Sequence, residues 1–234
     1  MPIINQVVSG GGSAPAHYIE KSVDANGKLV NSSNIIDLTG VTDIGDFVLY
    51  YAYYNNTTIS GAADMSDLTT LTGFNACYSM FYNCTGLTSV DLSSLTTISG
   101  NYACQQMFQG CAGITSVDLS SLTSLTGQSA CSAMFRGCTG LTSVDLSSLI
   151  TVSVQSACNG MFRDCTSLTT VRIGNTTAID FGTYTNQFQS IFLGCTQNID
   201  VYAPAANQTA IEAMSGYPNF GGTGTVTWHW NTAA

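Results

Sequence analysis

Apolar and polar positions alternate in a short stretch that recurs along the chain. In one copy, Leu87, Val90, Leu92 and Leu95 are apolar, and Asp91 lies between two of them. In an extended chain, Val90 and Leu92 point to one face while Asp91 points to the other. The pattern therefore predicts a short β-strand with one buried face.

A second pattern, with helical spacing, follows each such stretch. Cys104, Met107, Phe108 and Cys111 are spaced i, i+3, i+4 and i+7, which predicts a short helix with one apolar face. Residues suited to cap the start of this helix are Asn75, Ser129 and Ser156. Residues that tolerate a left-handed conformation stand where it would end, at Asn83, Gly110, Gly137, Asp164 and Gly194. Each unit is thus predicted to be strand, turn, short helix and turn.

The whole pattern repeats every 27 residues. Two cysteine rows share this spacing: Cys77, Cys104, Cys131 and Cys158, and Cys84, Cys111, Cys138 and Cys165. So do a methionine row and a phenylalanine row: Met80, Met107, Met134 and Met161, and Phe81, Phe108, Phe135 and Phe162. In an earlier, less regular copy, Tyr53 and Tyr54 stand in the places of the methionine and the phenylalanine. Such a period is typical of a solenoid, in which stacked coils bury their apolar sides against one another.

The period divides the chain into three parts. We expect residues 35–198 to form an α/β solenoid with 27-residue coils, built from a parallel β-sheet and short helices. Residues 1–34 lie outside the repeat and are expected to form an N-terminal, β-rich anchor, and residues 199–234 a C-terminal cap.

The N-terminal part carries two local signals. Ile3, Ile4, Val7 and Val8 form an apolar segment that we expect to serve as an anchor or an oligomerisation strand. Further on, the dipeptide Asn26-Gly27 separates two segments with strand-like alternation, which predicts a β-hairpin.

Each copy also joins the sequence LTSVDLSSL, or a variant of it, to a Phe-x-x-Cys tetrad. The tetrads are Phe81-Tyr82-Asn83-Cys84, Phe108-Gln109-Gly110-Cys111, Phe135-Arg136-Gly137-Cys138 and Phe162-Arg163-Asp164-Cys165. This pattern resembles the BspA-type bacterial leucine-rich repeats over residues 37–220. The segment that starts at Asp200 resembles the cap of that family, with a last strand, a short helix and an aromatic turn. The resemblance implies a leucine-rich repeat solenoid in a surface protein that binds other proteins or host molecules.

Charged residues are scarce in this chain. They make up 8% of the residues, against about 25% in an average soluble domain. The five basic residues can neutralise few phosphates, so we expect no nucleic-acid partner. We also expect no membrane insertion, because there is no run of about 18 apolar residues. The segment MPIINQVVSGGGS lacks the basic and apolar regions of a secretory signal, so we expect no export by that route.

The sequence contains no recognisable enzyme motif, neither a nucleophile elbow nor a phosphate-binding loop nor a zinc-protease helix. We therefore expect a protein that is not an enzyme and that has no cofactor.

Nine cysteines raise the question of disulfides or zinc. Cys104 and Cys111 would be about 10.5 Å apart along the predicted helix, beyond the roughly 7 Å that a disulfide spans. The count is odd, and no C-x-x-C occurs. The pattern favours buried free thiols and no metal site, with disulfides between coils or a zinc site as alternatives.

A row of aspartates is the sharpest candidate for a binding site. It comprises Asp37, Asp64, Asp91, Asp118 and Asp145, and Arg172 takes the next place. Stacked like charges repel, so hydrogen bonds to turns, a divalent cation or a polar ligand must offset them. Hydrogen bonds to turns are the favoured interpretation. The candidate ligand-binding residues are Ser89, Asp91, Ser93, Ser116, Asp118, Ser120, Ser143, Asp145 and Ser147.

These features favour a non-enzymatic structural and recognition protein. The apolar strand followed by Gly10-Gly11-Gly12-Ser13 loosely resembles the N-terminal anchors of phage tail and fibre proteins. We therefore expect a phage or prophage virion component, assembled in the host cytoplasm and exposed on the tail or the capsid. Its partners would be a protein or glycan on a host surface, other virion subunits, and further copies of itself. The alternatives are a bacterial cell-surface adhesin of the same repeat family and an intracellular protein-binding scaffold.

The aromatic segment 47–54, FVLYYAYY, has two interpretations. It is either the core that closes the first coil, which is favoured, or an interface between subunits.

Overall fold

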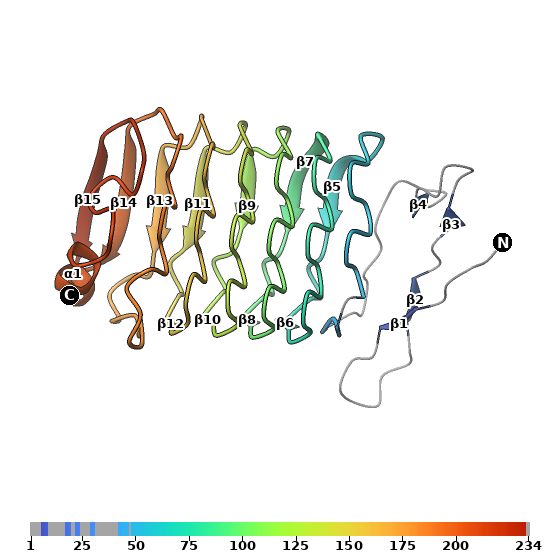
Figure 1. Cartoon of the computed structure of the whole chain (residues 1–234), viewed down its shortest axis with the longest axis horizontal. Helices are drawn as coiled ribbons and strands as arrows, with labels where there is room; N and C mark the ends of the chain where they lie inside the picture. Colours follow the sequence, from blue (N-terminus) through green and yellow to red (C-terminus); the bar gives the residue numbers. More distant parts are fainter. Residues whose placement is uncertain are drawn as a thin grey trace.

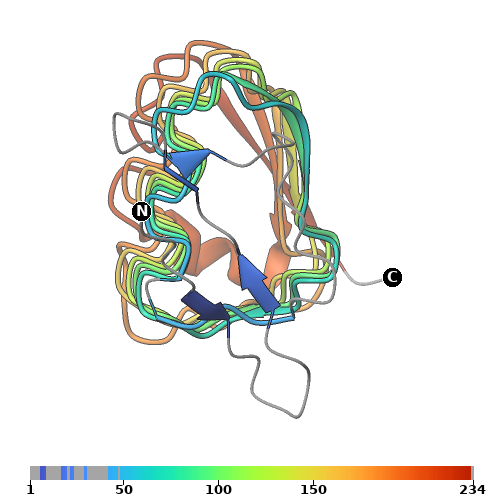
Figure 2. The same cartoon turned by 90° about the vertical axis from the view of Figure 1, so that its right-hand side faces the viewer.

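The protein is a solenoid whose coils stack along one axis (Figure 1). The computed structural model describes residues 42–46 and 48–232 in full, and the backbone of residues 6–8, 17–19, 22–23 and 29–30. Seen along the axis, the coils superpose on one another (Figure 2), so equivalent residues of successive coils form rows.

A seven-stranded parallel sheet forms one side of the solenoid. In spatial order its strands are β15 (Val226–Asn231), β14 (Ile199–Pro204), β13 (Thr170–Ile173), β11 (Ser143–Leu146), β9 (Ser116–Asp118), β7 (Gly86–Asp91) and β5 (Ser60–Asp64). Within β9, Val117 is buried while Ser116 and Asp118 are exposed, so one face of the strand covers the core. The alternation in the sequence thus correctly predicts the strands and their faces.

A second, smaller parallel sheet forms another side of each coil. Its strands are β12 (Thr151–Val152), β10 (Ser124–Leu125), β8 (Thr97–Ile98) and β6 (Thr70–Leu71). Threonine hydroxyls reinforce it: Thr96 and Thr123 each donate through Oγ1, at 3.0 Å, to the carbonyl oxygen of the residue 27 positions earlier. Hydroxyl rows on this side therefore bond one coil to the next.

The third side differs from the predicted short helix, because it consists of successive turns. The amides of Cys77 and Ser79 donate to the carbonyl oxygens of Ala103 and Gln105 in the next coil, at 2.8 and 2.9 Å. Between them, the amide of Tyr78 donates to the carbonyl of Asn75, three residues back, at 3.3 Å. In an α-helix every such amide would bond within its own segment. Here alternate amides bond to the neighbouring coil, so the predicted helices are wrong for these repeats.

The turns explain why certain residues recur at fixed places. On the turn side of the coils, every fourth residue has a positive φ, as does the third residue of a type II turn. Asn83, Gly110, Gly137, Asp164 and Gly194 lie in one such row, with φ between 56° and 79°, as their residue types predicted. Asn75, Ser129 and Ser156 lie in another, with φ of 50–56°, and so are turn residues rather than helix caps.

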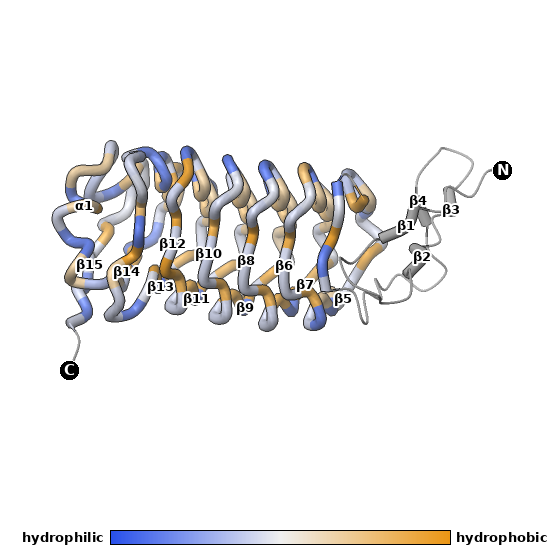
Figure 3. The backbone as a smooth tube through the Cα atoms, turned by 90° about the horizontal axis from the view of Figure 1, so that it is seen from below, coloured by the Kyte–Doolittle hydropathy of each residue, from blue (hydrophilic) through white to orange (hydrophobic). Residues whose placement is uncertain are grey.

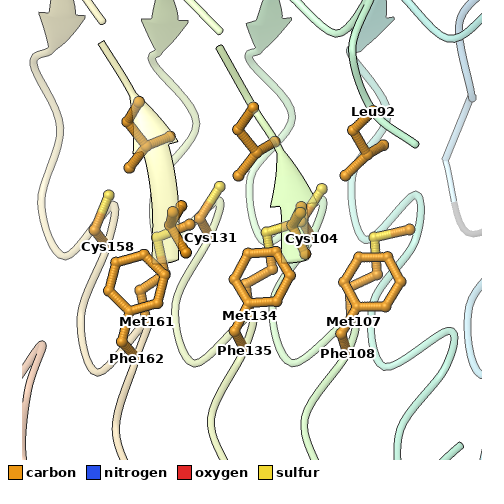
Figure 4. Close-up of a cluster of buried hydrophobic side chains, with 14 of the residues drawn as sticks. Leu92, Cys104, Met107, Phe108, Cys131, Met134, Phe135, Cys158, Met161 and Phe162 are labelled. Carbon is orange, nitrogen blue, oxygen red and sulfur yellow. The ribbon is translucent and has the colours of Figure 1, made fainter. Parts of the chain in front are cut away.

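The core is built from the rows that the sequence predicted (Figure 4). Phe81, Phe108, Phe135 and Phe162 are fully buried and stack with ring centroids 5.3, 5.5 and 6.1 Å apart. Hydrophobic and hydrophilic residues recur at the same places in successive coils (Figure 3). Stacked rings add a favourable contact to the burial of their area.

All nine cysteines are buried and free, so both cysteine rows form part of the core, as their spacing predicted. In one row, each thiol donates to a backbone carbonyl of the preceding coil. Cys111 bonds to the Phe81 oxygen at 2.9 Å, and Cys138 to the Phe108 oxygen at 3.1 Å. The thiols thus combine apolar packing with a hydrogen bond between coils.

The first described coil is offset by one residue from the predicted alignment. Tyr53 stacks on Phe81 at 5.5 Å, and Tyr54 stacks on Tyr82 at 4.6 Å. Tyr53 therefore occupies the phenylalanine row, 28 residues before Phe81, and not the methionine row. By Ala62 the spacing is again 27, and the strand pairing shifts there. A short irregularity on each side of Tyr53 thus accounts for the error.

The C-terminal part continues the solenoid and closes it. After β14 come the 3₁₀ turn η1 (Ala205–Asn207), the helix α1 (Gln208–Glu212) and an aromatic turn, and β15 then pairs parallel to β14. The rings of Tyr217 and Phe220 in that turn each lie 5.9 Å from Trp228, which packs against the end of the core. The strand, short helix and aromatic turn follow the predicted order.

The N-terminal part contains two antiparallel strand pairs, β1 (Gln6–Val8) with β2 (His17–Ile19), and β3 (Ser22–Val23) with β4 (Leu29–Val30). The second pair encloses Asn26-Gly27 and confirms the predicted hairpin. Ile3, Ile4 and Asp37 lie outside the described residues, as do the side chains of Val7 and Val8. Their roles and the boundaries 1–34, 35–198 and 199–234 stay predictions.

Candidate functional site

The outer face of the seven-stranded sheet carries two parallel rows of polar residues. Strand register places Ser89, Ser116, Ser143 and Thr170 side by side in one row. In the other row, Asp64, Asp91, Asp118 and Asp145 are followed by Arg172, Tyr202 and His229. We call this surface the sheet face. Neighbouring strands lie about 4.8 Å apart, so a ligand on it would contact several coils at once.

Each described aspartate of the row closes a turn at the end of its strand. Asp91, Asp118 and Asp145 accept a hydrogen bond at Oδ1 from the backbone amide two residues on, at 3.0, 2.9 and 2.8 Å. The donors are Ser93, Ser120 and Ser147. Asp64 makes the same bond to the amide of Ser66, and a second to its hydroxyl. This geometry agrees with the favoured interpretation, in which bonds to turns offset the repulsion.

These hydrogen bonds also affect the acidity of the row. The backbone amide and then the hydroxyl of Ser120 donate to the carboxylate of Asp118 and lower the pKa of that carboxyl. The carboxylate is therefore charged at neutral pH, and the face presents negative charge alongside neutral hydroxyls.

Two shallow depressions lie on the sheet face. One, of about 360 Å³, is lined by Ser116, Asp118, Ser120, Ser143, Asp145, Thr170 and Arg172, among others. The other, of about 510 Å³, is lined by Asp64, Ser89, Asp91, Ser93, Ser116 and Asp118, among others. Together they include every candidate residue of the sequence except Ser147, which lies at the turn after β11. The structure thus places the candidates on one surface, while their binding of a ligand stays a prediction.

The sequence did not predict the cluster at the C-terminal end of this face. The Arg172 guanidinium lies over the Tyr202 ring, 4.6 Å from its centroid, and the Tyr202 ring stacks on His229. His229 Nε2 is 2.8 Å from Asp200 Oδ1. The interval between paired residues grows from 27 to 30 between Arg172 and Tyr202. This longer coil hid the continuation of the row, although Arg172 was recognised as its next member.

Within the described residues, no group of three or more histidine, cysteine, aspartate or glutamate side chains is arranged to hold a metal ion. The described part of the chain also contains no helix that is long and apolar enough to span a membrane.

We expect millimolar Ca²⁺ to leave the melting temperature of the protein unchanged within about one degree. At each of the four described aspartates of the row, a serine amide already bonds to the carboxylate that a cation would need. Differential scanning fluorimetry with and without Ca²⁺ measures this, and Mg²⁺ serves as the control for ionic strength. A rise of several degrees with Ca²⁺ alone would show that the aspartate row is a cation site.

A comparison with protein-family models identifies the repeat. The model of the BspA type leucine-rich repeat region matches in six copies, over residues 28–134 and 75–191. The searches of curated proteins and of solved structures returned no significant match. The matched residues cover most of the chain, and the rows of the structure are those of the repeat. The chain therefore belongs to the family of BspA-type leucine-rich repeat proteins.

Proposed function

We propose that this protein is a non-enzymatic recognition protein that binds a macromolecular partner through the sheet face. The observation that carries the proposal is the continuous exposed surface of hydroxyls and carboxylates across β5 to β13, with two depressions in it. Membership in a leucine-rich repeat family supports protein binding, because such solenoids are commonly binding scaffolds.

The chemistry of the face indicates what the partner offers. Asp118 and Asp145 can accept hydrogen bonds and attract basic groups, while Ser116 and Ser143 both donate and accept. Arg172 is the only lysine or arginine in the described rows of this face, and it precedes Tyr202 and His229 at the C-terminal end. We therefore propose a partner with hydroxyl or basic groups along an extended contact, either a protein or a glycan.

Site-specific photo-crosslinking in the native source tests this proposal. A benzophenone amino acid replaces Ser116 or Ser143, both of which are exposed on the sheet face. The same amino acid at Thr126, which is exposed next to the smaller sheet, is the matched control. We expect one common adduct from the first two positions and none from the control. Equal adducts from all three positions, or an adduct from the control alone, would contradict the proposal.

A matched pair of charge variants measures the same contact. Ser116→Arg with Ser143→Arg introduces two long cations beside the depressions and is expected to weaken binding of the crosslinked partner at least tenfold. Thr126→Arg with Gln128→Arg adds the same charge at exposed positions elsewhere and is expected to leave binding unchanged. Surface plasmon resonance on the full-length chain provides the affinities.

We further propose that the protein is part of a phage or prophage virion, on the tail or the capsid. The N-terminal strand pairs precede the solenoid, which is where an anchor would lie. Immunogold electron microscopy of the native source is the test, and we expect label on particles. Label on the cell envelope would instead identify a surface adhesin, and label in the cytoplasm an intracellular scaffold.

A further inference from the structure

Five tyrosines gather on the turn side of the first two described coils. Tyr50 stacks on Tyr78 at 5.3 Å, and Tyr54 stacks on Tyr82 at 4.6 Å, so two short rows run along the solenoid axis. Tyr51 lies between the rows, 4.9 Å from Tyr54 and 5.6 Å from Tyr78. We call these five residues the tyrosine patch.

The patch is only partly explained by the core. Within the same segment, Val48, Leu49, Ala52 and Tyr53 are buried and close the first coil, as the favoured interpretation of residues 47–54 predicted. In contrast, 37–40% of the surface of Tyr50, Tyr51 and Tyr54 is exposed. The exposed rings therefore need an explanation other than core packing.

Tyr51 occupies a position that disfavours a large side chain. Its φ is 53°, and the equivalent residues in the following coils are Ser79, Gln106, Ala133 and Gly160, all with φ of 49–58°. Those residues form the same turn without an aromatic ring. Tyr102 also has a positive φ, of 58°, in a different row of turns, so what distinguishes Tyr51 is that no other described member of its own row is aromatic. The turn thus does not require the tyrosine, whereas an interface would use it.

The composition of this surface suits a protein contact. Along the same rows, Tyr78 and Tyr82 are followed by Gln105 and Gln109, and the Tyr82 hydroxyl is 3.5 Å from Gln109 Nε2. Tyrosine combined with small amides and hydroxyls is the composition of antibody paratopes, because its ring gives large contact area at little cost in conformational entropy. Rings that already stack on one another lose even less freedom on binding.

Charge favours a second copy of this chain as the occupant. The chain has a formal net charge of −9, and its sheet face carries a row of carboxylates. The rows of the tyrosine patch contain no charged residue until Arg136, two coils beyond Tyr82. Two acidic chains repel least when neutral surfaces meet and the carboxylate rows point away. A two-fold contact also needs a surface that complements itself, and phenol and amide groups both donate and accept hydrogen bonds.

From these observations we propose that the tyrosine patch is the interface through which two copies of this chain form a dimer. The three exposed tyrosines offer about 230 Å² in total, given side chains of roughly 200 Å² each. A standard interface buries about 800 Å² per partner, so the contact extends along the glutamines and the association is weak. This inference is independent of the function proposed for the sheet face.

Analytical ultracentrifugation of the full-length chain over about 1 to 500 μM tests the dimer, since mass action makes its population depend on concentration. We expect the mass to rise from that of the 24.6 kDa monomer towards twice this value. The test variant is Tyr78→Gln with Tyr82→Gln. The next coil already has glutamine at both of these row positions, so we expect the fold to accept the substitutions. We expect it to weaken the dimer at least tenfold, and circular dichroism checks that it is folded.

Two controls make the result specific. Tyr184→Ser removes a tyrosine that is 45% exposed outside the patch and is expected to leave the dimer unchanged. Deletion of residues 1–12 removes the predicted oligomerisation strand with Ile3, Ile4, Val7 and Val8, and is also expected to leave it unchanged.

Three outcomes would overturn the proposal. The chain stays a monomer over the whole range, or the dimer survives the glutamine variant, or the deletion of residues 1–12 alone dissociates it. A benzophenone amino acid at Tyr54 in the native source adds a direct test, and we expect a crosslink to the chain itself. An adduct with a different protein or with a glycan alone would show that the patch serves another partner.

Discussion

Replacing Gly100 by alanine is expected to destabilise the protein by at least about 3 kcal/mol, and to prevent folding if the native stability is low. Gly100 belongs to a row with Gly73 and Gly127, where adjacent coils approach each other closely. A Cβ at Gly100 would overlap the carbonyl group of Gly73 and approach the Thr72 carbonyl oxygen. Those atoms belong to the backbone of the preceding coil, so they cannot move without disturbing the stack. Urea unfolding followed by circular dichroism measures the change in free energy.

Gly137→Ala is the matched control for this substitution. Gly137 has a φ of 72°, and the nearest atoms to an added Cβ lie 3.7 Å away, in Gly110. Alanine there meets backbone strain without overlap, so we expect a loss of about 1 kcal/mol. Both substitutions reduce the freedom of the unfolded chain equally, so their difference isolates the steric effect. Equal losses at the two positions would contradict the importance of close coil contact.

A steep loss of stability above pH 9 is the second large effect that we expect. Burial raises the pKa of eight thiols above the ordinary value of 9.0, to about 12 for Cys158 and about 11 for Cys195. The others are Cys77, Cys104, Cys111, Cys131, Cys138 and Cys165. Above pH 9 the unfolded chain loses these protons while the folded chain keeps them, so the free energy of unfolding falls as pH rises.

The size of this effect follows from the number of thiols. One pH unit above the ordinary thiol pKa corresponds to about 1 kcal/mol for each thiol that stays protonated in the folded chain, so the eight thiols together account for roughly 10 kcal/mol at pH 10. This is comparable to the whole stability of a typical domain, about 5–15 kcal/mol. Urea unfolding between pH 7 and pH 10.5 tests it, with a reducing agent present. Cys131→Ala removes one titrating thiol. We expect the free energy of unfolding of this variant to fall less steeply with pH, by the equivalent of one proton. A flat profile up to pH 10.5 would contradict buried, protonated thiols.

The fold was largely predictable because one period recurs in several residue types at once. The rows of Cys104, Phe108 and Asp118, read at 27-residue spacing, correspond to the rows that lie in contact in the structure. A stacked solenoid converts sequence spacing directly into spatial neighbours. The apolar face of the strands followed from the alternation around Val90 in the same way.

The helices were mispredicted for a physical reason. The side chains with helical spacing do point into the core, at Cys104, Met107, Phe108 and Cys111. A run of turns brings the same residues inward as a helix would, so their spacing fits both structures. A helix and this run of turns differ in the hydrogen-bond acceptor of alternate backbone amides. In the turns, that acceptor is a carbonyl of the neighbouring coil. Apolar periodicity carries no information about that partner. The left-handed positions occupied by Asn83 and Gly110 were the available signal, and they mark turns.

The candidate site was predictable only where the period holds. Ser116, Asp118, Ser143 and Asp145 follow the 27-residue spacing and lie together on the sheet face. The contacts of Tyr202 with His229, and of His229 with Asp200, arise after the spacing lengthens to 30 residues, and they could not be found by counting. The offset of Tyr53 has the same origin at the other end of the solenoid.

Because coils bond to one another through the same backbone hydrogen-bond ladders, the number of coils between two surfaces sets the distance between them. The tyrosine patch lies in the first described coils, and the Arg172 cluster lies near the opposite end. Duplication or loss of one 27-residue copy between them would change their separation by about 4.8 Å and leave both surfaces intact. Recombination between similar copies could therefore change the distance between two contact surfaces in single steps during evolution, without any new side-chain chemistry.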